Sequence, residues 1–198
     1  RFEDTPLWFT RMGVSAQADS LLSYLRREAP RNGLDTMAFF VPRIAEDLSI
    51  VRSLDFDSLG VSINEVLPRL DYLLSKAYVR YAAGQHYGFV RPDRLLNNLN
   101  MKPDSSGYAH LFDYDVKAPD YEEVMRKLQP DDRENYLLAS QPTSQVYRSL
   151  QFRLGASANV DERRQLALNM ERCRWQVNHP ETQERMVIVN LPAQQLLA

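Results

Sequence analysis

The chain has 198 residues, of which 44% are hydrophobic and 25% are charged, as is ordinary for a globular protein. Its formal net charge of -2 and its isoelectric point near 6.0 give no electrostatic case for binding nucleic acid. Its longest apolar runs fall far short of the roughly 20 residues that a membrane-spanning helix needs. The chain opens on Arg1 rather than on Met, so we expect a processed or trimmed piece of a longer protein, in which a missing signal peptide is uninformative.

The first part of the chain predicts a succession of helices. Ser15 can cap a helix that Pro30 ends, and its apolar face is formed by Ala18, Leu21, Leu22 and Leu25. Asp35 or Thr36 could cap a second helix over residues 37–40. After Pro42, a third helix is predicted by the helical spacing of Ile44, Leu48, Val51 and Leu54.

Residues 62–83 carry the longest apolar stripe in the sequence, wide enough to face a core. Ser62 and Glu65 form a capping-box pattern, and Val61 and Val66 are placed as a hydrophobic staple. Pro68 lies inside this pattern and should bend or shorten the first part of the helix.

The pattern weakens over residues 84–119, where we expect a short helix after Pro92 and an aromatic-rich loop. Helical spacing resumes at residues 120–130, where Asp120 is the cap. The residues expected to face inward there are Val124 and Leu128. Two further helices are predicted over residues 132–140 and 143–154.

The last predicted helix begins at Asp161, and residues 185–198 then alternate like a β-strand. One strand cannot satisfy its own backbone groups, so it would need a sheet that the rest of the chain does not supply. The expected fold is therefore mostly α, a multi-helix domain that ends in one β-strand.

Cys173 is the only cysteine and lies between Arg172 and Arg174, a setting that raises the question of an activated nucleophile. Such a nucleophile needs a base. The histidines are His86, His110 and His179. None of them stands in a motif that fixes it beside the thiol. Successive helix residues point about 100° apart, so the arginines aim away from the face that Cys173 shares with Leu166 and Met170. We therefore expect a buried, structural thiol that reacts slowly.

The sequence offers no pattern for a metal or a cofactor, and none is expected. Acidic residues alternate at 55–60 and 112–116, but neither stretch has the length or the glycine position of an EF-hand loop. Glycine-rich phosphate loops and G-x-S-x-G elbows are absent. The residues by themselves therefore assign no catalytic group.

Residues 167–198 are more specific, because they resemble the junction of the large periplasmic L,D-transpeptidases. In that family a helix with an Asn-Met/Leu-Glu-Arg-x-Arg-Trp motif runs into a Val-Asn-Ile/Leu-Pro-Ala strand that opens the YkuD-type catalytic domain. The matching residues are Asn169, Met170, Glu171, Arg172, Arg174 and Trp175, then Val189, Asn190, Leu191, Pro192 and Ala193. A looser similarity to the helical scaffold domain of the same family covers residues 6–9, 16–35 and 73–95.

The resemblance implies a helical scaffold domain over residues 1–176 and the start of a truncated catalytic domain over residues 177–198. The parent enzyme would crosslink peptidoglycan in the periplasm without a cofactor or metal. Its cysteine thiolate would attack a diaminopimelate carbonyl of one stem peptide, release D-alanine and pass the acyl group to the amine of a second stem. The family nucleophile lies in a His…Ser-x-Gly-Cys pattern, and no glycine in this sequence is followed by cysteine. Family members also often insert a peptidoglycan-binding module in the scaffold, for which this sequence leaves no room.

The expected partners are the chain's own catalytic domain and peptidoglycan, with no nucleic acid and no membrane span. The residues expected to hold the domain junction are Asn169, Glu171, Arg172, Arg174, Trp175, Asn190 and Pro192. In the simpler interpretation the two arginines are solvated and Trp175 is a packing residue. In the junction interpretation these residues set the angle between the scaffold and the catalytic domain, so Arg174→Ala would lower crosslinking by the intact enzyme while this chain loses less than about 1 kcal/mol. A glycan-binding surface should expose aromatics beside arginine, and the candidate contacts are Tyr81, Tyr87, Phe89 and Arg91.

Two alternatives remain open. In the first alternative, the helical domain is an interaction module that recruits cell-wall machinery. Such a module should expose an apolar patch of several hundred Å². In the second, it is an unrelated helical protein whose terminal motif is a coincidence.

Overall fold

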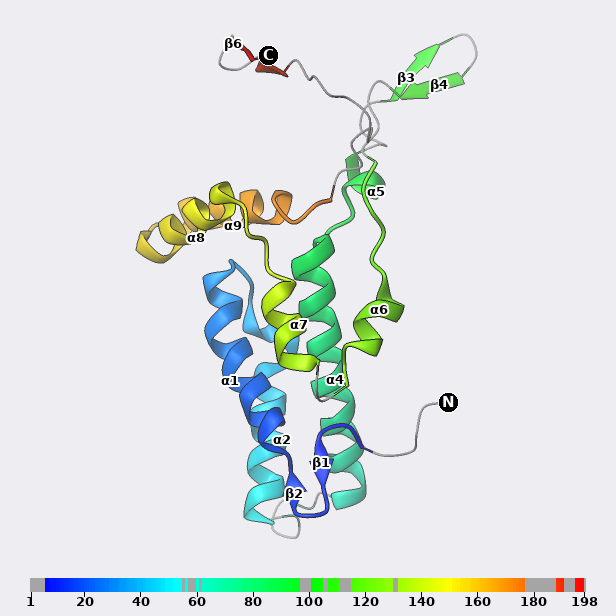
Figure 1. Cartoon of the computed structure of the whole chain (residues 1–198), viewed down its shortest axis with the longest axis vertical. Helices are drawn as coiled ribbons and strands as arrows, with labels where there is room; N and C mark the ends of the chain where they lie inside the picture. The colour runs from blue at the N-terminus through cyan, green and yellow to red at the C-terminus, as the bar shows by residue number, and fades with distance from the viewer. Residues whose placement is uncertain are drawn as a thin grey trace.

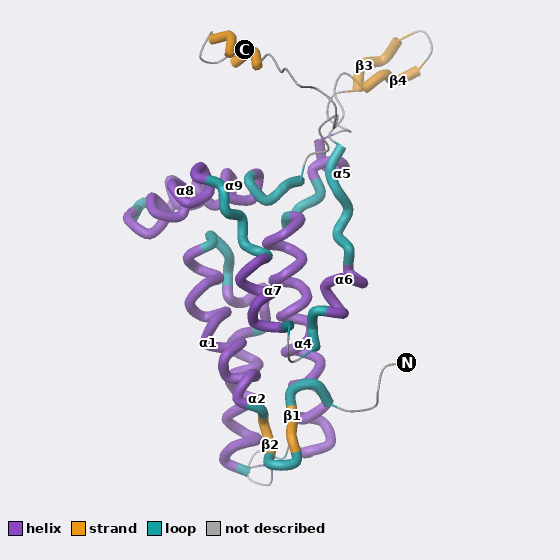
Figure 2. The backbone as a smooth tube through the Cα atoms, in the orientation of Figure 1, coloured by secondary structure: helices purple, strands orange, loops and turns teal. Residues whose placement is uncertain are grey.

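The computed structural model describes residues 6–54, 56, 60, 62–96, 101–104, 107–110, 115–129, 132–176, 188–190 and 195–197. These residues are mostly helical, which confirms the expected fold class (Figures 1 and 2). The helices are α1 (Ala16–Arg31), the 3₁₀ helix η1 (Thr36–Phe39), α2 (Val41–Ser53), α4 (Ile63–Tyr87), α5 (Pro92–Leu96), α6 (Tyr121–Arg126), α7 (Arg133–Ala139), α8 (Gln145–Ala156) and α9 (Val160–Arg172). The strands pair antiparallel, β1 (Phe9–Thr10) with β2 (Gly13–Val14), β3 (Met101–Asp104) with β4 (Gly107–His110), and β5 (Ile188–Asn190) with β6 (Gln195–Leu197).

The long helices α1, α2 and α4 run along the molecule, and α6 and α7 pack against α4 (Figure 1). Helices α8 and α9 pack on each other and lie across one end of this bundle, where α8 contacts α1. The β1–β2 hairpin lies at the opposite end. The described part of the chain contains no helix that is both long and apolar enough to cross a membrane.

The end of the chain differs from the sequence expectation of a single strand. Ile188–Asn190 pairs with Gln195–Leu197, with Ile188 opposite Leu197 and Asn190 opposite Gln195. The physical reason is that an unpaired strand leaves its backbone donors and acceptors open, and the nearest chain able to satisfy them is the residues that follow. Other predicted boundaries shift by a few residues, since α1 includes Pro30 in its last turn and α4 continues to Tyr87.

The helix starts follow the predicted caps in most cases. Asp35 and Asp120 each accept a hydrogen bond from a backbone N–H of the turn that follows, and Ser144, for which no cap was predicted, does the same at the start of α8. Ser62 caps α4 by accepting a hydrogen bond from the N–H of Asn64, whereas the capping-box pattern expects the donor to be the N–H of Glu65. Ser15 stands at the N-cap of α1 without a side-chain cap, and its buried Oγ has no partner among the described residues.

Two features expected of α4 have different outcomes. The helix runs through Pro68 without ending, so the proline does not shorten it. Val61, the expected half of a hydrophobic staple, lies outside the described residues.

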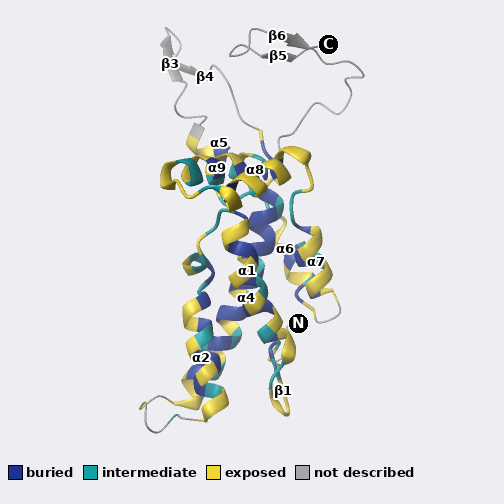
Figure 3. Ribbon diagram, turned by 90° about the vertical axis from the view of Figure 1, so that its left-hand side faces the viewer, coloured by how far each residue is buried: buried dark blue, intermediate teal, exposed yellow. Residues whose placement is uncertain are grey.

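The core is organised around α4, whose buried face contacts helices on several sides (Figure 3). Aromatic rings fill its centre, where Phe39 and Tyr24 meet the Tyr81 ring edge to face at 5.4 and 5.6 Å between centroids. A second, smaller cluster lies between α8 and α9 and consists of Tyr147, Leu154, Leu166 and Met170. The molecule therefore has one main core and a satellite core under α8 and α9.

The segment before α1 is fastened to α4 and α7 through Trp8, which is fully buried. The backbone N–H groups of Leu7 and Trp8 donate to Asp71 Oδ1 at 3.0 and 3.1 Å, and Trp8 Nε1 donates to Ser75 Oγ at 2.9 Å. The guanidinium of Arg133 lies 3.8 Å from the Trp8 ring centroid. This segment is therefore an integral part of the bundle.

We expect Trp8→Ala to lower the free energy of unfolding by about 3–5 kcal/mol, because it removes a large buried ring and leaves a cavity. Met12→Ala in the same hairpin is the control, since Met12 is 96% exposed and should change stability by less than about 0.5 kcal/mol. Urea unfolding followed by circular dichroism measures both. Equal small losses in the two variants would show that the segment does not contribute to the core.

Candidate functional site

Arg174 is the centre of a buried polar network just beyond the end of α9, and only 2% of its surface is exposed. Its Nε donates to Gln85 Oε1 at 2.9 Å, and its Nη1 donates to Glu171 Oε2 at 3.2 Å. Its Nη2 donates to the carbonyl of Asn32 at 2.6 Å and to the hydroxyl of Tyr147 at 2.9 Å. One guanidinium therefore links the ends of α1, α4 and α9 to α8, which corrects the expectation that this arginine is solvated.

Glu171 fastens the turn that follows α4. Its Oε1 accepts the backbone N–H groups of Phe89 at 2.6 Å and Val90 at 2.8 Å, and also Trp175 Nε1 at 3.3 Å. A side chain at Gly88 would collide with the Trp175 ring, whose Cδ1 would lie 2.7 Å from a Cβ, and the φ of +90° there also favours glycine. The Glu171 carboxylate, the Trp175 indole and the turn after α4 thus pack together as one unit.

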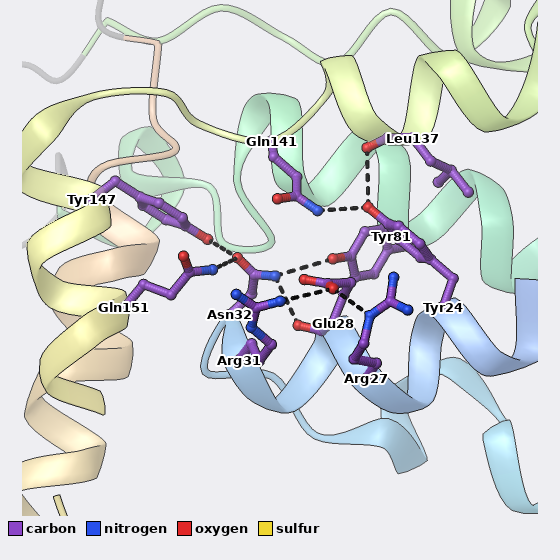
Figure 4. A network of polar contacts seen from close by, with 10 residues as sticks. All are labelled: Tyr24, Arg27, Glu28, Arg31, Asn32, Tyr81, Leu137, Gln141, Tyr147 and Gln151. Carbon is purple, nitrogen blue, oxygen red and sulfur yellow. Dashed lines mark hydrogen bonds and ion pairs between the residues drawn. The ribbon is translucent and has the colours of Figure 1, made fainter. Parts of the chain in front are cut away.

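Asn32 joins the same network from the end of α1 (Figure 4). Its Nδ2 donates to the carbonyl of Glu28 at 2.7 Å and to the Tyr81 hydroxyl at 3.3 Å. Its Oδ1 accepts from the Tyr147 hydroxyl at 2.7 Å and from Gln151 Nε2 at 3.2 Å. The amide is fully buried, so each of these bonds is made without competition from water.

Burial raises the pKa of Tyr147 to about 12, although the charge of Arg174 and its hydrogen bond act in the opposite direction. The hydroxyl therefore stays protonated at physiological pH. It can donate to Asn32 while it accepts from Arg174.

Gln176 extends the network to the chain that leaves α9. Its Nε2 donates to the carbonyl of His86 at 2.8 Å, and its own carbonyl accepts from the N–H of Lys117 at 2.8 Å. The exit of the chain from α9 is thus held against the end of α4 and the segment before α6.

The other expected junction residues lie in different surroundings. Asn169 and Arg172 are exposed on α9, and Arg172 Nη1 donates to Asn169 Oδ1 at 3.3 Å. Asn190 is the last residue of β5, and Pro192 lies outside the described residues. The structure therefore separates the motif into an inner set (Glu171, Arg174 and Trp175) and an outer pair (Asn169 and Arg172).

The candidate glycan contacts are not a surface cluster. Tyr81 and Tyr87 are buried, because the stripe of α4 that carries them faces the core, so their rings cannot stack on a sugar in this structure. Phe89 is partly buried and lies against Phe39 and Arg174. Arg91 pairs with Asp93 through two hydrogen bonds of 2.9 and 2.7 Å.

Cys173 is half-buried rather than fully buried, and it packs against the satellite core that contains Leu166 and Met170, as its helix face predicted. Burial raises the pKa of its thiol, and the nearby charge of Arg174 lowers it to a smaller extent. The arginine uses its donors on other groups, so the thiol is not activated by it.

The network can position chain segments, but its groups do not form an acid–base or nucleophilic set. Its charged groups are the buried Arg174 and the partly buried Glu171, which bond to each other and to the backbone. Among the described residues, no group of three or more His, Cys, Asp or Glu side chains could hold a metal ion. What the described contacts do is hold α8, the ends of α1 and α9, and the turn after α4 together.

The sequence did not single out Asn32, Gln85 and Tyr147 as members of this site. Gln85 carried a usable signal, because it continues the apolar stripe of α4 four residues after Tyr81 and is a polar residue on a buried face. Asn32 and Tyr147 gave no such signal, since the contacts between them join residues 115 positions apart.

Comparison with protein families matches residues 2–154 to the family described as Scaffold domain. The chain belongs to this family. No curated protein and no solved structure matches the chain. The matched residues include α1 to α7 and nearly all of α8, whereas α9 and the inner set follow the matched range.

We expect Arg174→Ala to lower the free energy of unfolding by about 3–5 kcal/mol, because it leaves buried acceptors and the Glu171 carboxylate without their partner. Arg172→Ala is the matched control on the exposed face of α9 and should change stability by less than about 0.5 kcal/mol. Denaturant unfolding of the two variants makes the comparison. A loss below 1 kcal/mol for Arg174→Ala would restore the solvated interpretation.

We expect Cys173 to react with a thiol reagent more slowly in the folded chain than in urea at pH 7–8. Its raised pKa leaves less thiolate, and packing restricts access. Because the folded pKa lies above the unfolded value, this group adds stability that is present below the unfolded pKa and is lost as the pH rises through the folded pKa. Equal labelling rates in the folded and unfolded chain would contradict the structural role.

Proposed function

We propose that this chain is the non-catalytic scaffold part of a peptidoglycan L,D-transpeptidase of the cell envelope. Its role is to support the catalytic domain and to position peptidoglycan during crosslinking. The proposal is supported by membership of the Scaffold domain family and by the resemblance of residues 167–198 to the transpeptidase junction.

The observation that carries the proposal is the set of hydrogen bonds that holds the end of α9 against α4. Arg174, Glu171 and Gln176 tie this end to α4, so the chain that follows starts from a fixed point on the bundle. A catalytic domain attached there would have a defined origin, which a reaction between two stem peptides needs. Asn169 and Arg172 remain exposed beside this origin and are available to contact that domain.

In this proposal the nucleophilic cysteine belongs to the catalytic domain and Cys173 has no part in the chemistry. The attacking thiolate would displace D-alanine from one stem and form an acyl-enzyme, and the amine of a second stem would then take the acyl group. The scaffold contributes position rather than proton transfer. The compartment is the periplasm.

A second candidate function is an interaction module that recruits cell-wall machinery. A groove of about 1090 Å³ between the β1–β2 hairpin, the end of α2 and the start of α4 favours it. Met12, Leu54 and Tyr72 line this groove and are largely exposed. The β1–β2 hairpin, which contributes to its lining, lies at the end of the bundle opposite α8 and α9 (Figure 1).

The test uses the full-length protein encoded by the gene that contains this sequence, incubated with purified tetrapeptide muropeptides. We expect crosslinked dimers and free D-alanine from the full-length protein and neither product from the 198-residue chain. Arg172→Ala in the full-length protein should lower the rate of crosslinking about threefold to tenfold if this residue contacts the catalytic domain, as loss of a polar contact worth ~1 kcal/mol does.

The outcomes separate the two candidates. If the full-length protein forms no crosslinks and releases no D-alanine, the transpeptidase proposal is wrong. Tyr72→Glu is the variant for the alternative, because an interaction module would lose a partner while the rate on purified muropeptides stays the same. D-alanine release by the 198-residue chain that disappears in Cys173→Ser would contradict the assignment of the nucleophile to another domain.

A further inference from the structure

A second pocket lies at the end of the bundle where α8 meets the end of α1 and the first turns of α9. Its volume is about 670 Å³, within the range of about 300–1,000 Å³ that is common for ligand sites. Arginines from three helices line it, namely Arg31, Arg148 and Arg163. Within the described residues no Asp or Glu lines the pocket, although the whole chain has a net charge of -2.

The three guanidiniums retain donors that the protein itself does not use. Arg148 is exposed, and its side chain makes no hydrogen bond or ion pair with another described residue. Arg31 donates to Glu28 through Nη1 at 3.1 Å with 59% of its side chain exposed. Arg163 uses Nη1 for the carbonyls of Leu154 and Ser157, at 2.7 and 3.1 Å, which fixes the position of its fork. A guanidinium with donors left over in this way can bind one carboxylate.

The same pocket has an apolar side. Phe152 lines it with 80% of its surface exposed, which is unusual for so large a ring. Gly155 lies beside it in α8, and a Cβ added there would meet no atom within 4 Å. The pocket therefore combines separate cationic forks with an open aromatic surface.

We propose that this pocket binds an acidic peptide segment, with carboxylates on Arg148 and its neighbours and an apolar side chain on Phe152. Charge complementarity supports this occupant, because the pocket is cationic and free of carboxylates while the rest of the chain has an excess of them. A nucleic acid is disfavoured, because a long polyanion would meet the net negative charge of the whole molecule. The proposal does not depend on the transpeptidase function.

The test measures binding of a fluorescein-labelled peptide, Glu-Glu-Leu-Phe-Glu-Glu, to the 198-residue chain by fluorescence anisotropy at low salt. We expect saturable binding with a Kd on the order of 10–100 μM, and at least about tenfold weaker binding of the same peptide with Gln in place of Glu. Arg148→Glu should weaken binding of the acidic peptide by about tenfold or more. Gly155→Met should weaken it as well, because its side chain enters the pocket without a clash at Cβ.

Arg164→Glu is the control, because it makes the same charge change on α9 at an exposed arginine that does not line the pocket. It should change the Kd less than about twofold, and unfolding curves for every variant check that the fold is intact. The proposal is overturned if the acidic peptide does not bind, if the Gln peptide binds equally well, or if Arg164→Glu weakens binding as much as Arg148→Glu. Displacement of the peptide by inorganic phosphate at equal concentration would also overturn it, since the site would then recognise any small anion.

Discussion

A buried guanidinium needs partners for its charge and its N–H donors, and this constraint determines how the end of the molecule is built. Arg174 donates four hydrogen bonds, to one carboxylate, one amide oxygen, one backbone carbonyl and one hydroxyl, from four different parts of the chain. None of these partners can move away without leaving a buried polar group unpaired, which costs about 1–3 kcal/mol. The network therefore fixes α8 and α9 on the bundle more specifically than the few apolar contacts of the satellite core would.

Close backbone approaches at two glycines depend on the same arrangement. A Cβ at Gly33 would lie 2.9 Å from Ala167 Cβ of α9, and a Cβ at Gly88 would lie 2.7 Å from Trp175. Both glycines have positive φ and follow a helix, α1 in the first case and α4 in the second. Because these glycines have no side chain, α9 and the residues after it can approach the ends of α1 and α4 closely. This close approach brings Glu171 within reach of the turn after α4.

The sequence predicts those features that depend on neighbours along the chain. Periodicity placed the helices, and short-range hydrogen bonds made Asp35 and Asp120 recognisable as caps. The sequence did not predict the burial of Arg174, because two arginines separated by one residue near a helix end look solvated. Its partners Asn32 and Gln85 lie 142 and 89 residues away. The prediction that Tyr81 and Tyr87 contact glycan failed for a related reason. A tyrosine ring has both an apolar and a polar part, so the sequence does not distinguish a buried tyrosine of α4 from an exposed one.

The division of the α9 motif into inner and outer residues gives the resemblance a physical meaning. Glu171, Arg174 and Trp175 have their partners inside the bundle, so selection for stability alone could maintain them. Asn169 and Arg172 contact each other on an exposed face, and an exposed pair of this kind adds little stability. The inner set therefore meets a requirement of the fold itself. In the proposed function the outer pair has a different role, because it is the part of the motif that the catalytic domain would contact on the exposed face of α9.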